Sequence, residues 1–362
     1  MKNNSISIIL RQYDLCPNCT KRLISKHIKK KKSTKKCFIC KNIFDNLDLH
    51  LENILEKISN YDFKTFQIGI IIQPSYLDRD DFIKSKFKIQ GVENIKFAIL
   101  TELTKKISKI TSTTREINEP DLIIEVIFKD ELCTIRTKPL FIYGRYKKTK
   151  RNLRQRKDLC KKCHGIGCHN CGFNGVLNEI SVESKISNFL KSKFECNTVK
   201  INWIGGEEQS SLVLGNGRPF FAKLNNPKKR NRILRNFSDH DGIFLFEFKK
   251  LKSQPKGFVP FKSEISARVV SESLISSSQL KNLKKLEKDE LQFFSKGKSI
   301  SKKIYKINYK KTAKNKFNLN LFLDGGIPIK SLIETQEITP NVSNLLGSAC
   351  RCEKFDFKRI EI

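Results

Sequence analysis

The segments Cys16-Pro-Asn-Cys19 and Cys37-Phe-Ile-Cys40 set the expected fold of the N-terminal part of the chain. The two pairs are 17 residues apart, a spacing typical of a structural zinc site. A second, tighter set follows at Cys160-Lys-Lys-Cys163 and Cys168-His-Asn-Cys171, where the two glycines between the pairs permit sharp turns. Four thiolates complete the coordination of a zinc ion and leave no place for a reactive water. Both sets therefore predict structural zinc.

Other interpretations of these cysteines exist. A single CxxC is also a redox motif or a chance occurrence, and His164 or His169 could replace a thiolate in the second set. Eight of the 12 cysteines lie in CxxC pairs, as metal sites do in a reducing compartment. We interpret the remaining four as buried or incidental thiols: Cys133, Cys196, Cys350 and Cys352.

The charge of the chain indicates a polyanionic partner. Lys and Arg total 71 against 37 acidic residues, a formal net charge of +34. An anionic membrane surface would attract the same charge, but no apolar run approaches the ~20 residues of a transmembrane helix. The polar start MKNNSISIIL lacks the apolar core of a signal peptide. We therefore expect a soluble, cytoplasmic protein without a membrane partner.

Three basic runs accompany this excess, at Lys29 to Lys36, Lys147 to Lys162 and Lys228 to Arg235. Basic runs are often only solvated faces, yet together with the global charge they predict contact with nucleic acid. Tyrosines next to basic residues could stack on bases, although packing in a core explains each of them equally well. These tyrosines are Tyr143, Tyr146 and Tyr305.

The 362 residues suggest several domains of mixed α and β structure. We expect a zinc-binding module over residues 1–52, an RNA-binding domain over 53–145 and a core over 146–362 that carries the second cysteine set. Hydrophobic periodicity predicts helices through Phe97 to Ile110, Val182 to Leu190 and Leu280 to Leu291. Apolar and aromatic runs predict strands at Leu122 to Phe128, Phe220 to Leu224 and Ile243 to Phe248.

Four segments in order carry a family resemblance. They are Lys138-Pro-Leu-Phe-Ile-Tyr-Gly-Arg-Tyr-Lys147, Leu214-Gly-Asn-Gly-Arg-Pro-Phe220, Gly325-Gly-Ile-Pro-Ile-Lys330 and Thr339-Pro-Asn-Val-Ser-Asn-Leu-Leu-Gly347. With the zinc pairs, they resemble the archaeal and eukaryotic family of tRNA pseudouridine synthases that modify the TΨC loop. The resemblance implies an α+β protein with a zinc-bearing THUMP-type domain before a synthase core, a mixed sheet flanked by helices. It also implies tRNA as partner and no organic cofactor.

The family's chemistry implies roles for particular residues. Its nucleophilic aspartate, preceded by Gly-Arg-Glu, corresponds to Glu208 in Gly205-Gly-Glu-Glu208, so that Gly206 stands at the arginine position. Lys330 matches the basic partner that keeps the carboxylate ionised, and Tyr305 matches the aromatic residue beside the flipped uridine. The family segments also imply that Arg145 and Arg218 bind substrate.

The chain departs from the family pattern at two further places. Pro328 replaces a second substrate-facing tyrosine, and the basic segment before the Gly-Gly motif is shortened to Lys306 through Asp324. Glu207 is a less favoured substitute for the nucleophile, and an exposed acidic turn would also explain both glutamates.

Two function classes follow. One is an isomerase that converts uridine 54 and uridine 55 of the tRNA to pseudouridine. The other is a tRNA-binding protein or folding chaperone that has lost the chemistry. An enzyme should place Glu208, Tyr305 and Lys330 in one cleft, and we expect a monomer in either case.

Overall fold

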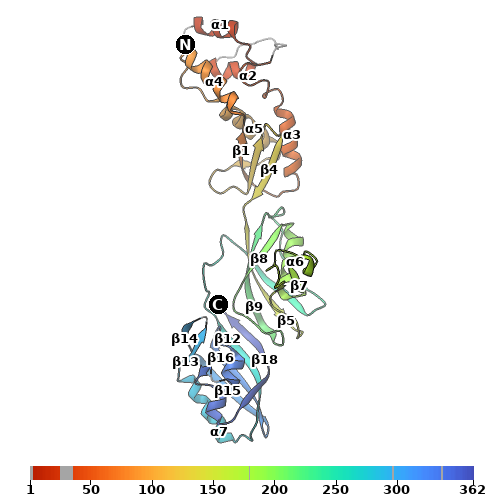
Figure 1. Cartoon of the computed structure of the whole chain (residues 1–362), viewed down its shortest axis with the longest axis vertical. Coiled ribbons are helices and arrows are strands. Elements are labelled where there is room, and N and C mark those ends of the chain that lie inside the picture. The colour runs from red at the N-terminus through yellow and green to blue at the C-terminus, as the bar shows by residue number, and fades with distance from the viewer. Residues whose placement is uncertain (1–2, 25–35, 179, 296, 336) are drawn as a thin grey trace. The chain divides into compact units, whose positions relative to one another are not determined.

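A computed structural model describes residues 3–24, 36–178, 180–295, 297–335 and 337–362. The chain forms two compact units (Figure 1). The first comprises residues 1–139 with 225–231, and the second comprises 140–224 with 232–362. Most of the basic run from Lys29 to Lys36 lies outside the described residues.

The first unit combines helices with a small sheet. Its strands have the order β2-β1-β3-β4, with β1 parallel to β2 and β3 and with β3 antiparallel to β4. Its elements are α1 (Asn3–Gln12), α2 (Pro17–Ile24), α3 (Leu47–Ile58), β1 (Thr65–Ile71), α4 (Pro74–Lys86), α5 (Ile95–Thr111), β2 (Thr114–Arg115), β3 (Leu122–Ile127) and β4 (Leu132–Thr137). Helices α3 and α5 pack on the sheet (Figure 1), and one apolar core joins them to the first cysteine set.

The predicted helix through Phe97 is confirmed as α5, but its buried face differs in part from the expected one. Asn94 caps the helix by accepting a hydrogen bond from the backbone N–H of Phe97. Leu103 and Ile107 are buried as expected, whereas Phe97 and Ile110 are more than half exposed. Ile95, Ala98 and Ile99 complete the buried face instead.

The second unit is built on a long mixed sheet of order β10-β11-β5-β9-β18-β12-β16-β15, with β8 also paired to β9. Neighbouring strands within this order are antiparallel except β9 and β18, which meet in parallel at Leu212 and Val213. Its strands are β5 (Leu140–Lys148), β6 (Asp158–Leu159), β7 (Val176–Asn178), β8 (Thr198–Trp203), β9 (Leu212–Asn225), β10 (Phe237–Ser238), β11 (Ile243–Leu251), β12 (Lys262–Ser271), β13 (Leu291–Ser295), β14 (Lys298–Lys302), β15 (Ile304–Ala313), β16 (Lys316–Asp324), β17 (Ile338–Thr339) and β18 (Cys350–Glu361).

The helices of this unit are α6 (Val182–Phe194), α7 (Ser277–Lys281), α8 (Ile329–Glu334), α9 (Val342–Leu346) and two 3₁₀ segments, η1 (His169–Cys171) and η2 (Asn282–Glu287). Helix α6 packs against β8 and β11, and α8 packs against β18. The predicted helix at Val182 and the three predicted strands are confirmed by α6, β3, β9 and β11.

The single helix predicted from Leu280 to Leu291 is wrong. The segment begins in α7, continues as η2 and enters β13 at Leu291. Leu280, Leu283 and Leu286 are buried at intervals of three residues, which suits the three residues per turn of a 3₁₀ helix better than an α-helix.

Candidate active site

A loop between β8 and β9 places two adjacent glutamates in opposite environments. The Glu208 side chain is 37% exposed, and its Oε2 lies 2.7 Å from Nζ of Lys330, whose side chain is 44% exposed. The hydrogen bond to Glu208 raises the pKa of Lys330. Lys330 therefore remains charged at neutral pH, and the structure brings together the carboxylate and the cation that the sequence pairs.

Glu207 faces the interior instead. Its side chain is fully buried. Its Oε2 accepts hydrogen bonds from the Tyr146 hydroxyl at 2.9 Å and from Arg218 Nε at 3.3 Å, and its Oε1 forms an ion pair with Lys148 Nζ at 3.1 Å. Desolvation, and secondly the charge of Glu207, raise the pKa of Tyr146 well above its ordinary value, so this phenol stays protonated and donates. A carboxylate that is enclosed in this way is not placed to attack a substrate.

The same network fixes the backbone of the loop. Lys148 Nζ donates to the carbonyl oxygens of Glu208 and Leu153, both at 3.0 Å. Gln155 donates to the Tyr146 hydroxyl at 3.1 Å and to the Gly205 carbonyl at 3.3 Å. Burial lowers the pKa of Lys148, whereas Glu207 raises it. The buried groups thus hold the loop at both sides of Glu207 and aim Glu208 outward.

Arg218 and Arg145, to which the family resemblance assigns substrate binding, are both buried. Arg218 exposes no surface: Nη1 donates to the Ile204 carbonyl at 2.8 Å, and the guanidinium lies 4.3 Å from the centre of the Phe357 ring. Arg145 donates to the Asn216 carbonyl at 2.7 Å and to the Tyr143 hydroxyl at 3.0 Å. Both guanidiniums form contacts inside the protein, and that of Arg218 also contacts Glu207, the neighbour of Glu208.

One aromatic ring joins the two segments that form the site. A Cβ on Gly205, whose φ is +71°, would lie 2.3 Å from Cζ of Phe261 and 2.9 Å from Nη1 of Arg218. A Cβ on Gly325 would lie 2.3 Å from the same ring carbon. Only glycine permits so close an approach at both positions. The ring of Phe261 therefore packs against both the loop of Glu208 and the segment that leads to Lys330.

Tyr305 lies next to this second segment. Its ring is partly exposed, its hydroxyl donates to Asp324 Oδ1 at 2.9 Å, and Lys262 Nζ lies 3.9 Å from the ring centre. Asp324 directly precedes Gly325, so Tyr305 is tied to the chain that carries Lys330. Tyr143 and Tyr146 are buried, which favours core packing over base stacking for both.

The structure also describes two of the positions that depart from the family pattern, Pro328 and Gly206. Pro328 is the N-cap residue of α8 and has an extended backbone. A Cβ on Gly206 would have only Gln155 Oε1 nearby, at 3.9 Å, so this position has room for a side chain.

The sulfur atoms of each cysteine set converge. In both sets the four Sγ atoms lie within 4.8 Å of one another, and contacts such as Cys160 to Cys168 and Cys163 to Cys171 measure 3.8 Å. Four thiolates at about 2.3 Å from one tetrahedral zinc would be about 3.8 Å apart. The donor sets Cys16, Cys19, Cys37, Cys40 and Cys160, Cys163, Cys168, Cys171 therefore fit a structural zinc ion, and neither histidine is needed as a substitute.

Backbone groups add to the fit of the second set. The N–H groups of Gly167 and Gly175 donate to the sulfurs of Cys163 and Cys171, both at 3.2 Å. Desolvation acts to raise the pKa of Cys163, but backbone hydrogen bonds lower it, and the net value is about 6. Such bonds favour thiolates, the form that binds metal. The four remaining cysteines are buried, as expected.

The basic run from Lys147 to Lys162 is only partly available to a ligand. Lys148 is buried with Glu207, and Arg151 forms an ion pair with Asp356 at 2.8 Å. Arg156 and Lys161 are exposed. No helix in the described ranges is long and apolar enough to cross a membrane.

Sequence reasoning did not find Tyr146, Lys148, Gln155 and Phe261 as supports of the site. Tyr146 and Lys148 flank the end of the first family segment, but nothing in the spacing connects them to Glu207. Gln155 and Phe261 carry no pattern signal.

Comparisons with known proteins agree with this architecture. A family model described as "Pus10, C-terminal" matches residues 141–361, and one described as "Pus10 THUMP domain, archaeal" matches residues 50–126. The tRNA pseudouridine synthase Pus10 of Nitrosopumilus maritimus (strain SCM1) is 38% identical over 368 residues, which cover 98% of this chain and 96% of the relative. The protein of the same name from Cenarchaeum symbiosum (strain A) is 29% identical over 365 residues, which cover 97% of this chain and 91% of the relative.

A solved Cbf5–Nop10–Gar1 complex matches 49% of this chain and 45% of its own with 12% identity and a TM-score of 0.31, a likeness too weak to support an argument. The matches to the family models and to the relative from Nitrosopumilus maritimus are independent of this structural likeness. They show an α+β protein with a THUMP domain before a pseudouridine synthase core, and the chain belongs to the Pus10 family.

Proposed function

We propose that this protein is a tRNA pseudouridine synthase that isomerises uridines of the TΨC loop, namely uridine 54 and uridine 55. The observation that carries the proposal is the partly exposed Glu208 carboxylate, 2.7 Å from the Lys330 ammonium. The relatives that cover nearly the whole chain are named as tRNA pseudouridine synthases, which supports tRNA as the substrate.

The reaction consumes no co-substrate. The bond between ribose C1′ and uracil N1 breaks, a bond between C1′ and C5 forms, and the proton on C5 is replaced by one on N1. In our proposal Glu208 supplies the nucleophilic carboxylate, Lys330 keeps it ionised and positioned, and Tyr305 stacks on the flipped uridine. Catalysis then rests on positioning, and no organic cofactor is required.

Glu208 is one methylene longer than the aspartate of the family. A displacement near 1 Å can cost on the order of 100-fold in rate, so the backbone must compensate. Gly205, whose φ of +71° is one that glycine adopts readily, lets the chain turn directly before the two glutamates.

We further propose two structural zinc ions, tRNA as the macromolecular partner, a monomer and a cytoplasmic location. The zinc ions would hold Cys16, Cys19, Cys37 and Cys40 in the first unit and Cys160, Cys163, Cys168 and Cys171 in the second. Neither set contains a residue of the Glu208 site.

The second candidate is a tRNA-binding protein without the chemistry. Glu208 at the aspartate position and Pro328 at the tyrosine position favour it. The deciding experiment incubates purified protein with an unmodified tRNA transcript and maps pseudouridine at nucleotide resolution. As an enzyme, the wild type should form pseudouridine, Glu208→Asp should keep or raise the rate, and Glu208→Gln should abolish it without loss of tRNA binding.

Two further variants test the assigned roles. Lys330→Met should lower kcat, because the carboxylate loses the cation that orients it, and Tyr305→Phe should be milder than Tyr305→Ala if stacking is the main role of the ring. If wild type and Glu208→Gln are equally inactive on every tRNA and both bind it, the protein is a binding protein.

A further inference from the structure

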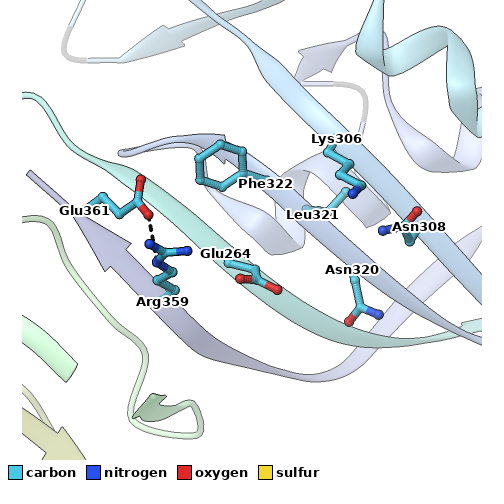
Figure 2. A pocket seen from close by; sticks show the side chains of 8 residues that line it. All are labelled: Glu264, Lys306, Asn308, Asn320, Leu321, Phe322, Arg359 and Glu361. Carbon is cyan, nitrogen blue, oxygen red and sulfur yellow. Dashed lines mark ion pairs between the residues drawn. The ribbon is translucent and has the colours of Figure 1, made fainter. Parts of the chain in front are cut away.

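A pocket lies on the solvent-facing side of the strands β18, β12, β16 and β15, and neither Glu208 nor Lys330 lines it. Its volume is about 230 Å³. The pairing of the strands brings its residues together. Glu264 on β12 lies opposite Phe322 on β16 and Arg359 on β18, and Asn308 on β15 lies opposite Asn320 on β16. Figure 2 shows the two amides at one end of the pocket and Arg359 at the other, with Glu264 between them.

The charges of the pocket are balanced, in contrast to the rest of the chain. Two carboxylates, Glu264 and Glu361, line it together with two cations, Lys306 and Arg359. Arg359 is already paired with Glu361 at 2.7 Å. In a protein of net charge +34, a phosphate has many better places to bind. The pocket therefore suits a neutral ligand with both donors and acceptors.

The side-chain amides of Asn308 and Asn320 allow the pocket to form hydrogen bonds with the edge of a base. Neither side chain has a hydrogen-bond partner within the described part of the protein, and directly opposed side chains on paired strands lie within about 5.5 Å. Each amide offers a carbonyl acceptor and an NH₂ donor, the combination that proteins use on base edges. Phe322 adds an aromatic wall, and Glu264 can accept from an exocyclic amine.

The pocket continues the surface around Tyr305. The rings of Phe322 and Tyr305 have centres 5.5 Å apart. Lys262 Nζ lies over both rings, at 3.9 Å from the centre of Tyr305 and 6.0 Å from that of Phe322. A base in the pocket would thus be next to a base that stacks on Tyr305.

We propose that this pocket binds a nucleobase next to the reacting uridine in the tRNA, and that Asn308 and Asn320 recognise its edge. The inference rests on the proposed function for the identity of the RNA. The volume of the pocket agrees with a single base as its ligand, because it is smaller than the roughly 300–1,000 Å³ of sites for larger small molecules.

Equilibrium binding tests the proposal without depending on catalysis. The dissociation constants of the wild type and of the double variant Asn308→Ala/Asn320→Ala are measured against tRNA transcripts with an abasic site at each nucleotide of the TΨC arm in turn. At one nucleotide, loss of the base should weaken tRNA binding by the wild type about tenfold. It should hardly change binding by the double variant, because that variant already lacks the contact. Pseudouridine mapping then places that nucleotide next to the modified uridine.

Asn318→Ala is the matched control, since Asn318 lies two residues before Asn320 on the same strand but does not line the pocket. It should behave as the wild type at every abasic position. If base removal weakens tRNA binding by the wild type and by the double variant by the same factor at every nucleotide, the pocket does not bind a base. The base-dependent difference between the wild type and the double variant could instead occur at a nucleotide that is not next to the modified uridine, which would overturn the assignment to its neighbour. If the difference occurs but no pseudouridine forms, the proposed function alone is overturned.

Discussion

At the scale of single residues, Glu207 and Glu208 show what a sequence can and cannot predict. The family motif identified Glu208 and Lys330, and the structure pairs them at 2.7 Å. The motif position favoured Glu208 over Glu207, but nothing in the sequence predicted that Glu207 is buried, because Tyr146 and Lys148, which enclose it, lie about 60 residues earlier in the chain. Nothing in the sequence predicted the burial of Arg145 and Arg218 either, since that burial depends on distant strands.

The buried network gives a stability prediction. Glu207→Gln removes one charge and leaves Lys148 and Arg218 without their anion, which should lower the free energy of unfolding by about 3 kcal/mol or more. Glu208→Gln, at the neighbouring exposed position, should change it by less than about 1 kcal/mol. Urea unfolding of both variants provides the measurement. Equal stability of the two would show that the network does not hold the loop.

At the scale of elements, local patterns predicted the type of most segments and failed where tertiary contacts decide. Periodicity found α5 and α6, and apolar runs found β3, β9 and β11. The segment from Leu280 was misjudged because its leucines repeat every three residues. The sequence contained no signal for the pocket on the outer face of the sheet, which arises from the register of four strands.

The glycines before Glu208 provide a matched pair at this scale. Gly205→Ala should reduce both the unfolding temperature and pseudouridine formation, because its positive φ and the ring of Phe261 exclude a Cβ. We expect a cost above about 1 kcal/mol in unfolding free energy. Gly206→Ala should have little effect on either, since its nearest neighbour would be 3.9 Å away. Thermal unfolding and activity assays compare the two, and similar losses in both variants would contradict the role assigned to Phe261.

At the scale of the whole molecule, each of the two units contains one cysteine set. We therefore expect about two zinc ions per chain by metal analysis. Cys37→Ser should increase hydrogen exchange throughout the first unit while the sheet of the second keeps its protection. Cys133→Ser is the control, because Cys133 is buried in the same unit but outside the set. Zinc-free protein from a chelator-free preparation would refute the metal assignment.

The net charge of +34 predicts that tRNA affinity falls steeply with salt. Within the basic run from Lys147 to Lys162, Lys148 and Arg151 are occupied by acidic partners, so neutralising them would not test phosphate contact. Arg156 and Lys161 are exposed, and each phosphate contact contributes about 0.9 to the slope of log affinity against log salt. Arg156→Gln/Lys161→Gln should therefore reduce the magnitude of the slope by about 1.8 in binding titrations.

The control for this experiment removes the same formal charge from paired lysines. Lys185→Gln/Lys316→Gln eliminates two cations that already face Asp239 at 2.7 Å and Glu353 at 3.0 Å. Because these lysines are held by carboxylates, the slope should stay close to that of the wild type. The same reduction in both double variants would mean that net charge alone governs the salt dependence, and an unchanged slope in Arg156→Gln/Lys161→Gln would mean that these two residues do not touch phosphates.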